Sequence, residues 1–133
     1  MTNVIRHDPY PVREPFHSIY THGVEVPGNA RTLYVSGQVG VSPDGTSLPS
    51  DFEGQCRQAI TSLISVLNSA DMDVPNIVKL GFYLTRPEDM EALVKIRMEM
   101  LQGVRPAITT VFVAGLVSPD WLVEVEAIAA SAD

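Results

Sequence analysis

Two carboxylates interrupt an apolar stretch close to the end of the chain. Residues 121–130 read Trp-Leu-Val-Glu-Val-Glu-Ala-Ile-Ala-Ala, which is typical of a buried strand apart from Glu124 and Glu126. Side chains alternate between the two faces of a strand, so both carboxylates would share one face with Leu122 and Ile128. The core face would hold Val123, Val125, Ala127 and Ala129. A carboxylate in partly dry surroundings has a raised pKa or needs a donor, and both conditions favour general acid–base chemistry. The spacing is also compatible with an alternative, in which the face that carries Glu124 and Glu126 is simply an acidic face in contact with solvent.

Other residues that could do chemistry have simpler explanations. His17 and His22 are poorly spaced for zinc and no third ligand joins them, so we expect no metal and no cofactor. Cys56 lies on the apolar stripe of an expected helix, which favours a small core residue over an activated thiol. Ser36 has no neighbouring His–Asp pair. Arg97, on the inner side of a second expected helix, is either an interface ion-pair partner or a side chain that reaches solvent.

Length and composition predict one domain over residues 1–133 with a single core. The hydrophobic share of 45% and the charged share of 19% are those of a folded protein. No apolar run approaches the roughly 20 residues that span a bilayer, so we expect no membrane contact. A net charge of −7 disfavours nucleic acid as a partner. The lone cysteine cannot form an internal disulfide, which favours a cytoplasmic location.

Hydrophobic periodicity predicts an α+β fold. Alternating residues indicate strands over residues 20–26, 33–41, 78–84, 108–116 and 122–129. Helical spacing indicates one helix that starts at a capping box of Ser50 and Glu53 and runs to Ala70. A second helix would start at a capping Thr85 and stop at Gly103. This order predicts one sheet with both helices on one face, and a second face apolar enough to need a partner.

Several motifs follow one another in an order that resembles a known family. They are Ser36-Gly37-Gln38, Asp44-Gly45, the helix over 55–67, Ile77-Val78-Lys79, Arg105-Pro106-Ala107 and Glu124-Val125-Glu126-Ala127-Ile128-Ala129. Over residues 20–130 the chain is similar to the Rid (YjgF/YER-type) family of enamine and imine deaminases. The resemblance implies a chorismate-mutase-like α+β fold and a homotrimer around a β-barrel core. It also implies small-molecule clefts between subunits, where the best-known members hydrolyse reactive enamines and imines.

The resemblance assigns roles to individual residues. Glu124 falls where the acid of the family orients the attacking water, which makes it the candidate catalytic residue. The candidate substrate-binding residues are Tyr20, Ser36, Gly37, Val94, Ile108 and Thr110. Ile108 stands where the family has the arginine that grips the substrate carboxylate, and Val94 stands where a polar residue is common. By this resemblance the chain is a divergent member that lacks the substrate-binding arginine.

The missing arginine changes the expected chemistry, because an isoleucine cannot replace a planar guanidinium fork. Arg105 is a possible anchor if a bend at Pro106 turns it inward, although on a regular strand it would face away from Ile108. Arg31 is a second, remote candidate. We expect an enamine or imine substrate larger or less acidic than 2-iminobutanoate and 2-iminopropanoate. The alternative is a non-catalytic small-molecule-binding or regulatory trimer on the same fold.

Overall fold

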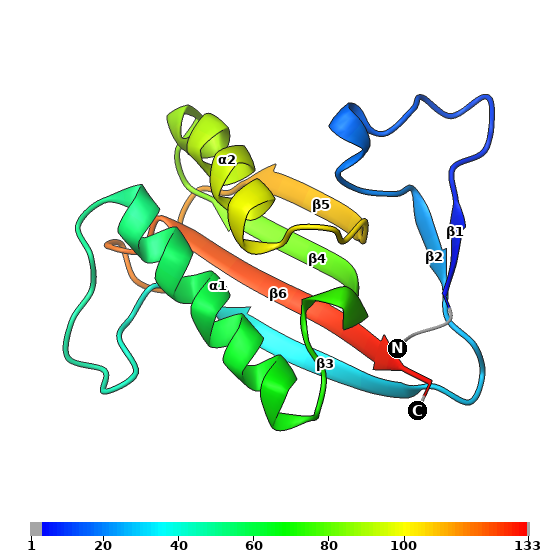
Figure 1. Cartoon of the computed structure of the whole chain (residues 1–133). Helices are drawn as coiled ribbons and strands as arrows, with labels where there is room; N and C mark the ends of the chain where they lie inside the picture. Colours follow the sequence, from blue (N-terminus) through cyan, green and yellow to red (C-terminus); the bar gives the residue numbers. More distant parts are fainter. Residues whose placement is uncertain (1–3, 133) are drawn as a thin grey trace.

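A four-stranded sheet forms the centre of the molecule, and two helices cover one of its faces (Figure 1). The computed structural model describes residues 4–132. The strands are β3 (Arg31–Gln38), β4 (Ile77–Leu84), β5 (Ala107–Phe112) and β6 (Val123–Ser131), in the order β3-β6-β4-β5. Strand β6 is antiparallel to β3 and to β4, whereas β4 and β5 are parallel. Strand β5 is therefore an edge of the sheet.

Helix α1 (Phe52–Ser69) packs on the sheet through an apolar stripe, as its spacing predicted. The buried apolar residues of this helix are Phe52, Cys56, Ala59, Ile60, Leu63 and Leu67. The expected capping box is wrong. The N-cap is Asp51, whose side chain makes no capping hydrogen bond, and the Glu53 carboxylate pairs with Arg57 at 3.0 Å. An ion pair one turn along the helix thus holds the carboxylate that the capping box would have used.

Helix α2 (Met90–Met100) also starts differently from the prediction. A 3₁₀ turn, η3 (Pro87–Asp89), comes before it, and Thr85 does not cap it. The amide of Thr85 instead donates to the carbonyl of Leu122, which continues the strand pairing. The helix ends as predicted before Gly103, whose φ of +76° lies in the left-handed region that favours glycine.

The segment before the main sheet forms a separate ribbon. Strand β1 (Ile5–His7) pairs with β2 (Gly23–Glu25) in a two-stranded antiparallel sheet. The prediction that residues 20–26 form a strand of one single sheet is therefore wrong. Only Thr21 joins the main sheet, through an isolated bridge to Ala107. The Asp8 carboxylate, next to the end of β1, accepts hydrogen bonds from the Thr21 hydroxyl at 2.6 Å and from the His22 amide at 2.7 Å, which holds this segment beside β1.

The core lies between the sheet and the helices, and the other face of the sheet is bare (Figure 1). Val123, Val125, Ala127 and Ala129 are buried in the core, as the alternation along this strand predicted. Strands β3 and β5 end earlier than expected, at Gln38 and Phe112. Neither of the two long helices, nor any other helix within residues 4–132, has the length and apolarity needed to cross a membrane.

Candidate functional site

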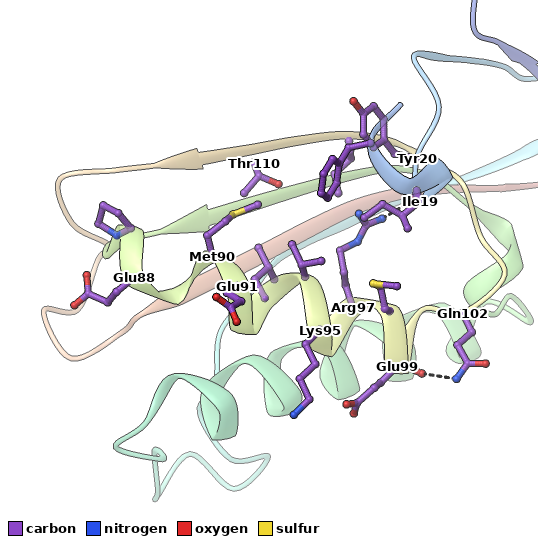
Figure 2. A pocket seen from close by; sticks show the side chains of 16 residues that line it. Ile19, Tyr20, Glu88, Met90, Glu91, Lys95, Arg97, Glu99, Gln102 and Thr110 are labelled. Atoms are coloured by element: carbon purple, nitrogen blue, oxygen red, sulfur yellow. Dashed lines mark hydrogen bonds between the residues drawn. The ribbon is translucent and has the colours of Figure 1, made fainter. Parts of the chain in front are cut away.

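A groove of about 1390 Å³ lies between helix α2 and the edge strand β5 (Figure 2). Residues 16–20 close one end of it. Its walls are mainly apolar and include Phe16, Ile19, Met90 and Met98. Four of the predicted binding residues line this groove, namely Tyr20, Val94, Ile108 and Thr110. The structure thus brings together residues that are separated by up to 90 positions in the sequence.

The pairing of β5 explains why Ile108 and Thr110 face the groove. In the parallel register with β4, Ile108 lies opposite Leu80 and Thr110 lies opposite Phe82. Leu80 and Phe82 are fully buried beneath the helices, and paired residues of neighbouring strands point to the same side. Ile108 and Thr110 therefore point to the helix side of the sheet. Because β5 is the edge strand, α2 covers them only in part.

The remaining predicted site residues gather on the opposite, bare face. Glu124 lies opposite Tyr83, whose neighbours Leu84 and Phe82 are in the core. The Glu124 carboxylate packs directly on Gly37, where an added Cβ would come within 1.8 Å of Oε2. Ser36, which is exposed, precedes Gly37 at the end of β3. Glu124, Ser36 and Gly37 therefore form a second group, which the sheet itself separates from the groove.

Glu126 has a partner that the sequence reasoning missed. The Tyr83 hydroxyl donates a hydrogen bond of 2.7 Å to Glu126 Oε2. This bond, together with desolvation and the nearby carboxylates, raises the pKa of Tyr83 above its usual value. Gly81, opposite Glu126, leaves room for the carboxylate, because a Cβ there would approach it to 3.2 Å. The alternation of Lys79, Gly81 and Tyr83 along β4 is the signal that could have placed this tyrosine beside the carboxylates.

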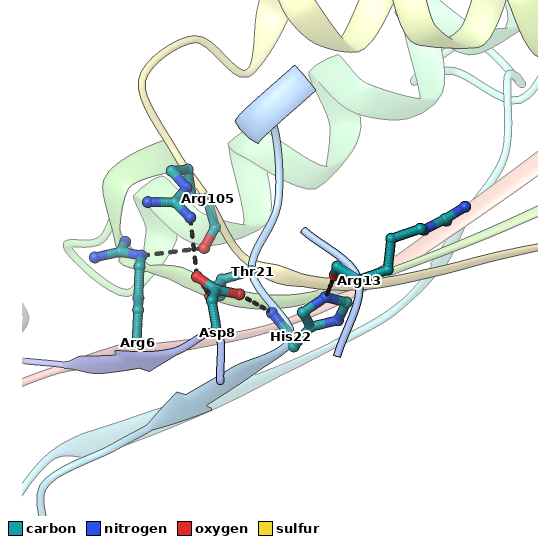
Figure 3. A network of polar contacts seen from close by, with 6 residues as sticks. All are labelled: Arg6, Asp8, Arg13, Thr21, His22 and Arg105. Atoms are coloured by element: carbon teal, nitrogen blue, oxygen red, sulfur yellow. Dashed lines mark hydrogen bonds and ion pairs between the residues drawn. The ribbon is translucent and has the colours of Figure 1, made fainter. Parts of the chain in front are cut away.

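Neither of the two candidate replacement arginines lines the groove. The Arg105 guanidinium pairs with Asp8 at 3.0 Å, within a network that also holds Thr21 and His22 (Figure 3). Arg105 lines a smaller hollow beside the groove instead. Arg31 lies on β3, which β6 and β4 separate from β5, and it donates to the carbonyl of Ala70 at 3.1 Å.

Arg97 is an arginine that does line the groove, and Lys95, also on α2, is a second cation among the lining residues. Arg97 rises from α2 toward Ile19 and Tyr20 (Figure 2), and only 6% of it is exposed. Its Nη2 donates a hydrogen bond of 2.8 Å to the carbonyl of Ile19, and burial lowers its pKa. The expectation of a side chain that reaches surface solvent is therefore wrong. Arg97 follows Val94 by three positions, and that helical spacing is the signal that could have placed both in one groove.

Comparison with known proteins identifies the family of this chain. The profile of the family described as "Endoribonuclease L-PSP" matches residues 14–131, nearly the whole chain. The chain belongs to this family, which is also called the Rid or YjgF family.

The relatives of this Rid chain include deaminases. It is 35% identical over 111 residues to a mouse protein named 2-iminobutanoate/2-iminopropanoate deaminase, which covers 83% of this chain and 79% of the mouse protein. It is 37% identical over 101 residues to the mitochondrial protein mmf2 of Schizosaccharomyces pombe, covering 74% and 79% of the two chains. The crystal structure of the Rid protein YyfB from Yersinia pestis matches with a TM-score of 0.85 and 27% identity, over 96% and 98% of the chains. The α+β fold with two helices is thus that of Rid proteins.

The other reactive side chains of this Rid chain have structural roles. Cys56 is completely buried in the core, and burial raises its pKa to about 12, so its thiol stays protonated. His22 contacts the ring of Tyr20 edge to face at 5.7 Å and hydrogen-bonds the carbonyl of Arg13. Within residues 4–132, no three His, Cys, Asp or Glu side chains converge closely enough to hold a metal ion.

Proposed function

We propose that this Rid protein hydrolyses a reactive enamine or imine that is larger or less acidic than 2-iminobutanoate and 2-iminopropanoate. The observation that carries the proposal is the composition of the groove. Four positions that bind substrate in the family come together there, yet Ile108 and Val94 are apolar where the family has an arginine and a polar residue. The deaminases among its relatives support the reaction class. A cytoplasmic site of action is part of this proposal.

The complete site would form between subunits of a homotrimer. Within one chain the sheet separates Glu124 from Ile108 and Thr110, so one molecule cannot present both groups to one substrate. In the proposed assembly, the groove of one subunit faces the Ser36, Gly37 and Glu124 surface of its neighbour. The bare face also exposes apolar side chains, among them Tyr34 at 75%, which supports burial against another subunit. A barrel of three such sheets is the assembly that we propose.

The proposed chemistry uses Glu124 as a general base. Its carboxylate would orient a water molecule and take its proton while the oxygen attacks the carbon of the C=N bond. Glu124 would return that proton to the substrate nitrogen, which gives a carbinolamine. The carbinolamine would then expel ammonia as its hydroxyl proton moves to the leaving nitrogen, and a ketone would remain. Backbone N–H groups near Gly37 and Thr110 would hydrogen-bond to substrate oxygen atoms and polarise a carbonyl group there.

Glu124→Gln tests this proposal against the matched variant Glu126→Gln. Imines would be generated from leucine, methionine, phenylalanine, alanine and 2-aminobutanoate by an amino-acid oxidase, and their lifetimes followed by trapping with semicarbazide. The wild type should shorten the lifetime of the larger imines most. Glu124→Gln should lower that rate by at least about 10-fold, because general bases contribute about 10²- to 10⁴-fold. Glu126→Gln should stay within about 3-fold, since Glu126 is bound to Tyr83. Full activity of Glu124→Gln would make Glu124 a structural residue.

The second candidate function is a non-catalytic small-molecule-binding or regulatory trimer. The missing cation at Ile108 favours it, because loss of a substrate anchor turns an enzyme scaffold into a binder. Ligand binding in the groove without acceleration of any tested imine would support this alternative. The name of the matching family mentions an endoribonuclease. The net charge of −7 argues against binding of a phosphate backbone by this chain.

A further inference from the structure

Arg97 is a buried guanidinium without a counter-ion. None of the carboxylates within residues 4–132 pairs with it, and desolvation is the one cause that shifts its pKa. Burying a charge without a partner is costly, and buried charges in proteins are normally paired, so an anion that reached this guanidinium would be stabilised by it. The guanidinium remains charged at neutral pH because its ordinary pKa is above 12.

The free donors of Arg97 lie at the wall of the groove. A guanidinium carries five N–H donors, and the carbonyl of Ile19 accepts from Nη2 alone. No nitrogen of Arg97 belongs to the described side-chain atoms that are buried without a hydrogen bond. The other donors are therefore not sealed in the core, and Arg97 lines both the groove and the smaller hollow beside it. Ile108 and Val94 line the same groove as Arg97, so one bound molecule could meet all three residues.

We propose that Arg97, from helix α2, binds the anionic group of the substrate in place of an arginine on strand β5. The acidic residues of the groove do not occupy it. Glu91 and Glu99 point away from the space between α2 and β5, and so does Lys95 (Figure 2). Glu99 is also paired with Arg57 at 2.8 Å. Glu88 lies at the far end of the groove, where η3 begins (Figure 2).

The groove and Arg97 together define a substrate class. The other walls are mainly apolar and include Phe16, Met90 and Ile108. The substrate that fits is a monocarboxylate with an extended apolar body, such as an imine of the size formed from leucine, methionine or phenylalanine. This inference rests on the proposed function, since it assigns a substrate to the same groove. Carboxylate binding needs no turnover, however, so it can be tested separately from hydrolysis.

Binding of hexanoate and its neutral isostere hexanamide to the full chain tests the inference. Nuclear magnetic resonance titration would give both affinities for the wild type, Arg97→Lys and Arg97→Met. The wild type should bind hexanoate at least about 10-fold more tightly than hexanamide, because an Arg–carboxylate pair is charge-assisted. Arg97→Met should lose this preference, and Arg97→Lys should keep part of it. Equal binding of the two probes by the wild type, or an unchanged preference in Arg97→Met, would overturn the proposal.

A second pair of variants covers the case in which Arg97→Met does not fold. Arg97 also ties α2 to residues 16–20 through Ile19, so its removal can loosen that segment. Val94→Asp leaves Arg97 in place and puts a carboxylate one helical turn away, which should neutralise it. Val94→Asn is the isosteric control. We expect the preference for hexanoate to disappear in Val94→Asp and to persist in Val94→Asn. Persistence of the preference in Val94→Asp would show that Arg97 does not bind the carboxylate and only holds α2 against residues 16–20.

Discussion

At the scale of single residues, Gly37 and Glu124 form one unit. The Glu124 carboxylate occupies the space that any side chain at position 37 would need. The atoms in conflict are the flexible end of Glu124 and not backbone, so a larger residue would turn the carboxylate away instead of disrupting the sheet. The glycine of the Ser-Gly-Gln motif thus has a physical reason, which is to let the candidate base lie flat on β3.

Gly37→Ala should therefore cost activity more than stability. We expect imine hydrolysis to fall at least about 10-fold, because a displaced base cannot orient its water. The free energy of unfolding should fall by less than about 1.5 kcal/mol, since only a side chain must move. The control is Gly28→Ala, whose added Cβ would meet no atom within 4 Å. Urea unfolding and the imine assay would measure both variants. Full activity in Gly37→Ala would contradict the role of this packing.

Ile108 is the residue whose replacement should move the protein toward the usual activity of its family. Ile108→Arg would place a guanidinium in the groove near the position where that activity binds a carboxylate. Hydrolysis of 2-iminobutanoate should rise about 10-fold or more, because each charge-assisted hydrogen bond contributes about 1.5 to 3 kcal/mol. Ile108→Met, which changes shape without charge, should show no gain. Brisk hydrolysis of 2-iminobutanoate and 2-iminopropanoate by the wild type would contradict this prediction.

At the scale of elements, the sequence predicted the buried face within a helix or strand, but it did not predict contacts between segments far apart in the chain. The apolar spacing of α1 predicted its buried face because neighbouring turns decide it. The pairing of β1 with β2 left no such signal. Part of what holds the ribbon is a contact between Asp8 and Arg105, which are 97 residues apart. The capping box failed for a different reason, which is local, since Arg57 one turn along the helix competes for the Glu53 carboxylate.

Gln55, in the first turn of α1, makes contacts of this long-range kind. Its amide donates to the carbonyls of Pro49 and Asp120, and its carbonyl accepts from the amide of Leu122. Gln55→Leu would leave these backbone groups without partners in a buried position. We expect a loss of about 2 to 4 kcal/mol in unfolding free energy. The control is Gln58→Leu on the same helix, which should cost less than about 1 kcal/mol. Urea denaturation of both variants is the measurement.

Asp8 should make the attachment of the ribbon dependent on pH. Hydrogen bonds from Thr21 and His22 and the charge of Arg105 lower its pKa below the ordinary 3.8. A lowered folded-state pKa stabilises the fold above the unfolded value, and this contribution is lost as the pH falls through the folded value. Amide exchange of β1 and β2 should therefore be slower in the wild type than in Asp8→Asn at about pH 6. The difference should shrink at about pH 3. An equal difference at both pH values would contradict the role of this carboxylate.

At the scale of the whole molecule, the division of the site was beyond the reach of the separate sequence patterns. The alternation of apolar residues predicted the two faces of each strand separately, and the core face of β6 was predicted correctly. Whether Ile108 shares a face with Glu124 depends on how β5 pairs with β4 and β4 with β6. That register puts the two residues on opposite sides. The site that we propose therefore requires a second copy of the chain.

Mixed trimers test this requirement directly. Glu124→Gln removes the candidate base, and Val94→Trp fills the groove, so each variant alone should be inactive on the imine that the wild type hydrolyses. Light scattering would first show that the wild type is a trimer of 14.5 kDa chains. The two variants would then be coexpressed with different tags, and mixed trimers would be purified through both tags in turn. In every mixed trimer one cleft joins the intact groove of a Glu124→Gln subunit to the intact Glu124 of a Val94→Trp subunit. Activity should therefore return to about a third of that of the wild type. If the mixed trimers are as inactive as their parents, or if the wild type is a monomer, the two groups of residues do not form a shared site.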